Sequence, residues 1–169
     1  MHPKQDRFDE NSIYFLKREE VIMSNLKRFI DAEKQDFDRA LSEIQAGQKQ
    51  SHWMWYIFPQ IHGLGFSSIS EFYSIHTLEE AVDFLKDPYL GKNLITISNA
   101  LLKLDTNDPH EVFGSPDDLK LCSSMTLFEI AAKEADGEIA NTDVFTKVLE
   151  KFYSGKRDQR TIDILNEKK

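Results

Sequence analysis

The chain has a single cysteine, five prolines and seven glycines among its 169 residues, and it has no long apolar run. With only Cys122 it cannot form an internal disulfide, which suits a reducing compartment. A membrane span needs roughly 18 apolar residues in succession, and the charged N-terminus lacks the apolar core of a signal peptide. We therefore expect a cytoplasmic protein without a membrane partner.

Positive charge is also scarce in this chain. Lysine and arginine together number 21, against 29 aspartates and glutamates, which gives a formal net charge of −8. The basic residues are scattered along the sequence, whereas binding to a nucleic-acid backbone depends on clustered lysine and arginine. A nucleic-acid partner is therefore not expected.

The sequence also lacks the motifs that are typical of common enzyme classes and metal sites. The chain contains no GxSxG, no P-loop and no GxGxxG. Its histidines His52, His62, His76 and His110 lack the spacing of metal ligands, and there is no second cysteine to complete a zinc site. The sequence predicts no metal and no cofactor, and it leaves catalysis open.

Helical periodicity is what the sequence does have. Apolar residues recur at steps of three and four from Leu26 to Leu165, and no stretch alternates long enough to predict a strand. Capping side chains mark the expected helix starts: Ser51, Ser67 or Ser68, Thr77 with Glu80, Asp87-Pro88, Asp108-Pro109, Ser115-Pro116, Thr142 and Asp158. The pattern predicts an all-α domain of about eight to nine helices, packed as an irregular bundle or an armadillo-like stack.

The N-terminal residues read differently from the rest. We interpret residues 1–24 as an appendage, with a frayed tail over the first ten residues and one or two amphipathic turns between Ile13 and Ile22. The single helical domain then covers residues 25–169. Its first helix starts at Asn25 and ends at Gly47, and a break near Lys34 is left open.

The chain is organised around one aromatic segment. Residues 53–58, Trp-Met-Trp-Tyr-Ile-Phe, are all large and apolar. A helix without a polar face has to be surrounded by protein, so we place this segment at the centre of the domain. Ser51 is expected to cap the helix and Pro59 to end it, and a loop with two glycines follows to Gly65.

Burying that segment also buries polar atoms, and two outcomes are possible. The polar groups can form a closed internal network, or some of them can face a ligand in a pocket. For the second outcome the ligand-binding candidates are Lys49, His52, Trp53, Trp55 and Gln60. Lys120 and Ser124 form a second candidate group, because with Asp117 they lie on one face of a helix near its N-terminus; the alternative there is a surface ion pair.

Three functions remain compatible with these residues. The first is a binding module for a small molecule or a peptide, with its site beside the tryptophans. The second is a hydrolase or transferase on a nucleotide-like substrate, with His52 as acid or base. The third is a scaffold without a ligand, in which both indoles are fully buried.

Five segments carry a resemblance to a known family: LKRFIDAE, ALSEIQAGQKQSHWMWYIFPQIHGLG, DPYLGKNL, FGSPDDLKLCSSMTLF and GKRDQRT. They resemble the "domain of unknown function 1810" family from about Leu26 to Leu165. The resemblance implies an all-α fold similar to armadillo-type stacking, and no established activity. Some relatives are labelled calpastatin, but calpastatin is a disordered chain of short repeats and this sequence is compact and unrepeated. Relatives usually have glutamine where this chain has Glu33.

Overall fold

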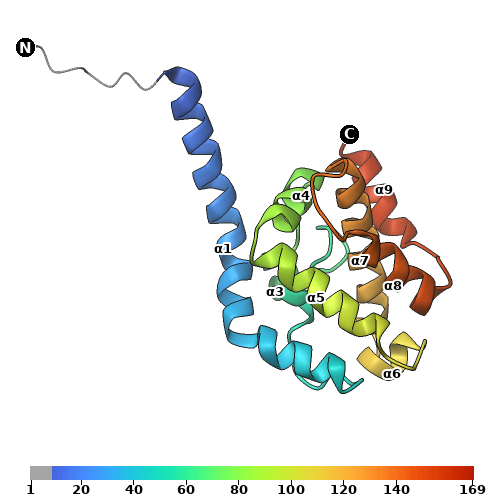
Figure 1. Ribbon diagram of the computed structural model, residues 1–169. Helices are drawn as coiled ribbons and strands as arrows, with labels where there is room; N and C mark the ends of the chain where they lie inside the picture. Colours follow the sequence, from blue (N-terminus) through green and yellow to red (C-terminus); the bar gives the residue numbers. More distant parts are fainter. Residues whose placement is uncertain (1–8) are drawn as a thin grey trace, which may run out of the picture.

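The computed structural model describes residues 9–169, and within them it is built from helices (Figure 1). The helices are α1 Glu10–Gln45, α2 Met54–Ile57, α3 Ser68–Phe72, α4 Leu78–Lys86, α5 Leu90–Leu102, α6 Pro109–Phe113, α7 Asp117–Glu134, α8 Asp143–Tyr153 and α9 Gln159–Glu167. The β-structure within the described residues is one isolated parallel bridge between Ile61 and Ile75. The predicted all-α fold is confirmed, and the armadillo-like stack stays a prediction.

Helix α1 is longer than the sequence suggested. It runs for 36 residues from Glu10, where the carboxylate of Asp9 accepts a hydrogen bond from the Ser12 amide. The expected start at Asn25 is wrong, because no glycine or proline interrupts the chain between the two points, and the helix continues past Lys34. Its N-terminal part projects from the body (Figure 1). The tail predicted for the first ten residues lies mostly outside the described residues.

Helix α7 lies at the centre of the packing, in contact with α4, α6, α8 and α9. Its residue Phe128 is fully buried, with its ring centroid 5.3 Å from Phe84 of α4 and 6.0 Å from Phe145 of α8. Helix α5 packs close behind α4, because Gly91 has no side chain to collide with the Leu85 carbonyl: a Cβ there would lie 2.1 Å from that oxygen.

The aromatic segment lies in the interior, as predicted. Trp53, Tyr56 and Phe58 are buried, whereas Trp55 is only half-buried. The rings of Trp53 and Phe58 lie 6.2 Å apart. Only four residues of the segment are helical, and the expected cap at Ser51 is wrong, because its hydroxyl donates instead to the carboxylate of Glu43.

Several predicted caps are present as hydrogen bonds. Ser67 accepts from the Ser70 amide, Thr77 from Glu80 and Asp108 from His110. The cap expected at Ser115 is wrong, because Pro116 is the N-cap of α7. Thr142 and Asp158 occupy the N-cap positions of α8 and α9 as predicted, but neither side chain makes a cap hydrogen bond.

Substituting Thr77 by alanine is expected to destabilise the fold by about 1 kcal/mol, because the Glu80 amide loses the hydroxyl oxygen 3.1 Å away. Thr142→Ala is the matched control, since Thr142 occupies the N-cap of α8 without a cap hydrogen bond. Urea unfolding of both variants measures the difference. Equal losses in the two variants would contradict the capping role of Thr77.

Candidate functional site

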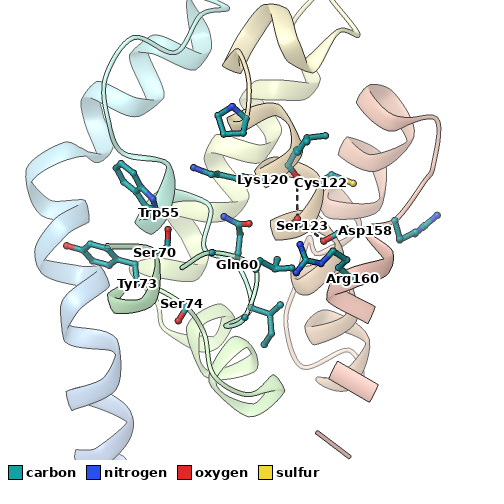
Figure 2. Close-up of a pocket in the computed structure, with 17 residues that line it drawn as sticks. Trp55, Gln60, Ser70, Tyr73, Ser74, Lys120, Cys122, Ser123, Asp158 and Arg160 are labelled. Atoms are coloured by element: carbon teal, nitrogen blue, oxygen red, sulfur yellow. Dashed lines mark hydrogen bonds between the residues drawn. The ribbon is translucent and has the colours of Figure 1, made fainter. Parts of the chain in front are cut away.

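A cleft of about 510 Å³ lies beside the aromatic segment. Three parts of the chain form it: the stretch from Trp55 to Ser74, the first turns of α7, and the start of α9. Figure 2 shows Trp55 and Tyr73 on one side of this space and Asp158 and Arg160 on the other, with Gln60 between them. We call this space the α7–α9 cleft.

Positive charge is concentrated in the α7–α9 cleft. Its lining includes Lys120, Arg157 and Arg160, against the single carboxylate of Asp158. This contrasts with the formal net charge of −8 for the whole chain. Among the charged side chains that line the cleft, the cations outnumber the single carboxylate, which favours an anion inside it.

Lys120 is held at the mouth of the cleft by two neighbours. Its ammonium lies 3.1 Å from the carboxylate of Asp117 and 5.4 Å from the centre of the Trp55 ring. Asp117 also pairs with Lys49 at 2.9 Å. The surface ion pair considered from the sequence is therefore present, and it extends to a second lysine.

Asp158 fixes the junction between α7 and α9. Its carboxylate accepts hydrogen bonds from the hydroxyls of Ser123 at 2.8 Å and Thr161 at 2.6 Å. Its own amide donates to Thr126 at 2.9 Å. These bonds hold the α7 and α9 parts of the lining together, so this part of the cleft is pre-organised.

Arg157 is anchored to the carboxylate of Glu129 by two hydrogen bonds, of 3.0 and 2.7 Å. Burial raises the pKa of Glu129, but the bonds from Arg157 and Thr146 outweigh it, and the pKa lies below its usual value. Glu129 therefore stays ionised and neutralises much of Arg157. Arg160 makes no hydrogen bond or ion pair with the residues that the structure describes, so its charge is the most available one.

The loop before α3 contributes Gln60 and Gly63 to the lining of the cleft. The Gln60 carbonyl accepts from the Ile75 amide at 2.9 Å, and the His62 amide donates back to Ile75 at 2.8 Å. Gly63 has a φ of 106°, which a residue with a side chain rarely adopts. The two backbone hydrogen bonds therefore hold the start of this loop against Ile75.

Three of the seven residues proposed from the sequence line the cleft: Trp55, Gln60 and Lys120. The other four lie elsewhere. Trp53 is fully buried and donates its indole N–H to Glu43 at 3.0 Å. The Lys49 ammonium is covered by Asp117 and the Ser51 carbonyl.

The remaining two, His52 and Ser124, have opposite environments. His52 is exposed on the surface and does not reach the cleft. Ser124 is fully buried, and its hydroxyl has no partner among the described residues. The helical spacing correctly places Ser124 on the same face of α7 as Lys120. Ser124 lies one turn further along the helix, however, where protein encloses that face.

A serine–histidine pair lies near the cleft without the geometry of a nucleophile. The Ser74 hydroxyl is 3.0 Å from Nδ1 of His62, but it also donates to the Glu71 carbonyl at 2.8 Å. A hydroxyl has one proton, so His62 must be the donor to Ser74 and cannot accept from it. Cys122 is also poorly suited to act as a nucleophile. Burial raises the pKa of its thiol to about 11, which disfavours the reactive thiolate.

Sequence reasoning missed the part of the cleft that α9 contributes. Arg157, Asp158 and Arg160 come from the segment GKRDQRT, about a hundred residues after Trp55. Tyr73 was not among the candidates proposed from the sequence. The two arginines within four residues were the one available signal.

Two further properties concern the described residues as a whole. From residue 9 to residue 169, no group of three or more histidines, cysteines or carboxylates is arranged to hold a metal ion. In the same range, no helix is both long enough and apolar enough to cross a membrane.

Comparison with known proteins gives a family and a structural relative. Residues 23–165 match the family model "Protein of unknown function (DUF1810)". A solved structure, the conserved hypothetical protein Rv1873 from Mycobacterium tuberculosis, is 41% identical with a TM-score of 0.78, and the match covers 84% of this chain and 96% of that one. None of the curated proteins matches. The chain therefore belongs to the DUF1810 family of proteins of unknown function.

Proposed function

We propose that the α7–α9 cleft binds a small anionic molecule that carries a flat ring. The observation behind this proposal is the reversal of charge: Lys120, Arg157 and Arg160 line the cleft of an acidic protein, opposite one carboxylate. That carboxylate, Asp158, already accepts hydrogen bonds from two hydroxyls. Arg160 is the group best able to bind the anion, because arginine matches carboxylate and phosphate oxygens in a bidentate manner.

The ring is proposed from the aromatic lining. Trp55 and Tyr73 are both half-buried and contribute surface to the cleft. An aromatic face exposed to a cleft can stack on a planar ligand. A volume of about 510 Å³ falls within the range of small-molecule sites, which favours such a ligand over a peptide.

The other functions considered from the sequence have less support. An enzyme with His52 as acid or base would need that side chain in the cleft, and it lies outside. A scaffold would bury both indoles, but Trp55 is half-buried beside a cleft. A cytoplasmic location remains part of the proposal, supported by the single cysteine.

A thermal-shift panel tests the proposal with adenosine monophosphate, indole-3-acetate, benzoate, inorganic phosphate and uncharged adenosine. The ring-bearing anions are expected to raise Tm, by roughly 2–4 °C for each kcal/mol of binding free energy. Phosphate and adenosine should each have a smaller effect on Tm, because phosphate has the negative charge without a ring and adenosine has the ring without the charge. If adenosine shifts Tm as much as the anions do, the cations have no role in recognition.

Charge removal at Arg160 is expected to weaken binding of the best anion in the panel. Arg160→Gln should raise Kd by about tenfold, the effect of losing one charge-assisted hydrogen bond near the surface. Lys92→Gln is the control, because it removes one positive charge from an exposed site on α5 outside the cleft. Isothermal titration of both variants measures Kd. Equal weakening in both would indicate a long-range charge effect and contradict the site.

A further inference from the structure

The N-terminal part of α1 projects from the body of the molecule (Figure 1), and its apolar side chains are exposed there. Every residue from Glu10 to Val21 is exposed. Six of the exposed side chains in this part of the helix are large and apolar: Ile13, Tyr14, Phe15, Leu16, Val21 and Met23. Exposed apolar surface of this extent marks an interaction site.

On one face of this helix, the order of residue types is complementary to the same order read in the opposite direction. Phe15, Arg18, Glu19 and Ile22 follow each other at steps of three, one and three, and therefore share a face. The same face continues to Leu26, which is buried against the body. Along the exposed part, the order is apolar, basic, acidic, apolar.

We propose that two copies of the chain pair through this face, with the helices antiparallel about a two-fold axis between Arg18 and Glu19. Phe15 then lies opposite Ile22 of the second copy, and Arg18 lies opposite Glu19. A two-fold axis repeats every contact, so both charges of both copies are paired. This self-complementarity indicates that the partner of the face is a second copy of the chain. A partner with a purely apolar groove would leave Arg18 and Glu19 buried without ion-pair partners.

The edges of the face supply apolar contacts around the charged pairs. Tyr14 and Val21 lie seven residues apart on one edge, and Leu16 and Met23 lie seven apart on the other. In the antiparallel arrangement, Tyr14 comes next to Val21 of the second copy and Leu16 next to Met23. The opposite side of the helix carries Lys17 and stays in water. The dimer would thus cover most of the apolar surface.

The body leaves room for the second helix. A groove of about 510 Å³ runs between α1 and α4, and Arg18, Ile22 and Leu26 line one side of it. Glu79 and Asp83 of α4 line the other side. The groove continues the same face of α1 toward the body, so the end of the second helix can enter it.

Analytical ultracentrifugation of the full chain tests this pairing. The wild type is expected to be a dimer. Arg18→Glu places a glutamate opposite Glu19 of the second copy, and Glu19→Arg places an arginine opposite Arg18 of the second copy. Each variant alone should therefore raise the dissociation constant at least about tenfold. An equimolar mixture of the two variants should dimerise again, because each then supplies the charge that the other needs.

Lys17→Glu is the matched control, since it changes the same charge on the outer side of the helix and should leave the dimer intact. Circular dichroism checks that all the variants keep their helix content. A wild type that stays monomeric at roughly 100 µM would overturn the proposal. A mixture of Arg18→Glu and Glu19→Arg that fails to associate would overturn it too. The test does not involve the α7–α9 cleft, so its outcome is independent of the proposed function.

Discussion

Replacing Glu43 by alanine is expected to destabilise the fold by roughly 2–4 kcal/mol, because one carboxylate organises the whole turn after α1. Its Oε1 accepts from the amides of Gln50 at 2.6 Å and Ser51 at 2.8 Å, and from the indole of Trp53 at 3.0 Å. Its Oε2 accepts from the Ser51 hydroxyl at 2.7 Å. Alanine would leave the fully buried Trp53 without a partner for its N–H.

The same carboxylate predicts an acid dependence. Burial raises the pKa of Glu43, but the hydrogen bonds from Gln50, Ser51 and Trp53 outweigh it and lower the pKa to about 2. A carboxyl group with a lowered pKa in the folded state stabilises the protein above its unfolded pKa of 4.5, and this contribution is lost as the pH falls toward 2. The stability difference between wild type and Glu43→Gln should therefore shrink below pH 4.5.

Urea unfolding between pH 3 and pH 7 measures both effects. Glu150→Ala is the control, because Glu150 is exposed on α8 and makes no hydrogen bond with any described residue. It should change stability by less than about 0.5 kcal/mol. If Glu43→Ala costs no more than this control, the carboxylate does not hold the turn, and the burial of Trp53 depends on packing alone.

Glu43 also illustrates the limits of prediction from this sequence. The run from Trp53 to Phe58 had to be buried because it offers no polar face, and that inference is confirmed. The partner of the Trp53 indole could not be predicted, because Glu43 lies on a separate helix and meets the ring only through the path of the intervening turn. Periodicity identifies a buried side chain, but it does not identify the atoms around it.

The candidate site was predictable to the extent that it is local. Trp55 and Gln60 are five residues apart in the sequence and both line the cleft, and Lys120 was found from its helical position. Tyr73 follows α3, and Arg160 enters the cleft because α9 packs against α7. No spacing within one segment encodes that arrangement. Local patterns therefore found Trp55, Gln60 and Lys120 and missed Tyr73 and the residues that α9 contributes.

Replacing Glu33 by glutamine is expected to stabilise the protein at neutral pH by roughly 1–3 kcal/mol. Glu33 is 3% exposed. Its Oε1 accepts from the Asn93 amide at 3.2 Å, and its Oε2 has no partner among the described residues. Glutamine keeps the acceptor for Asn93 and removes the ionisable group.

The sign of the pH dependence is opposite to that of Glu43. Burial raises the pKa of Glu33 well above 4.5, assisted by the charge of Asp87. The folded state therefore favours the protonated carboxyl, and its stability falls as the pH rises from 4.5 toward the raised pKa. The advantage of Glu33→Gln should accordingly be small at pH 4 and grow toward pH 7.

Urea unfolding of wild type and Glu33→Gln at pH 4 and pH 7 measures this change. Glu134→Gln is the control, because it makes the same substitution at an exposed position of α7 and should be neutral at both values of pH. A gain of equal size at pH 4 and pH 7 would show that the amide contact is responsible, and would contradict a buried ionisation. A gain confined to pH 7 means that this chain tolerates an acidic group at the inner face of α1 by keeping it protonated, so that Glu33 reduces stability at neutral pH while the fold is preserved.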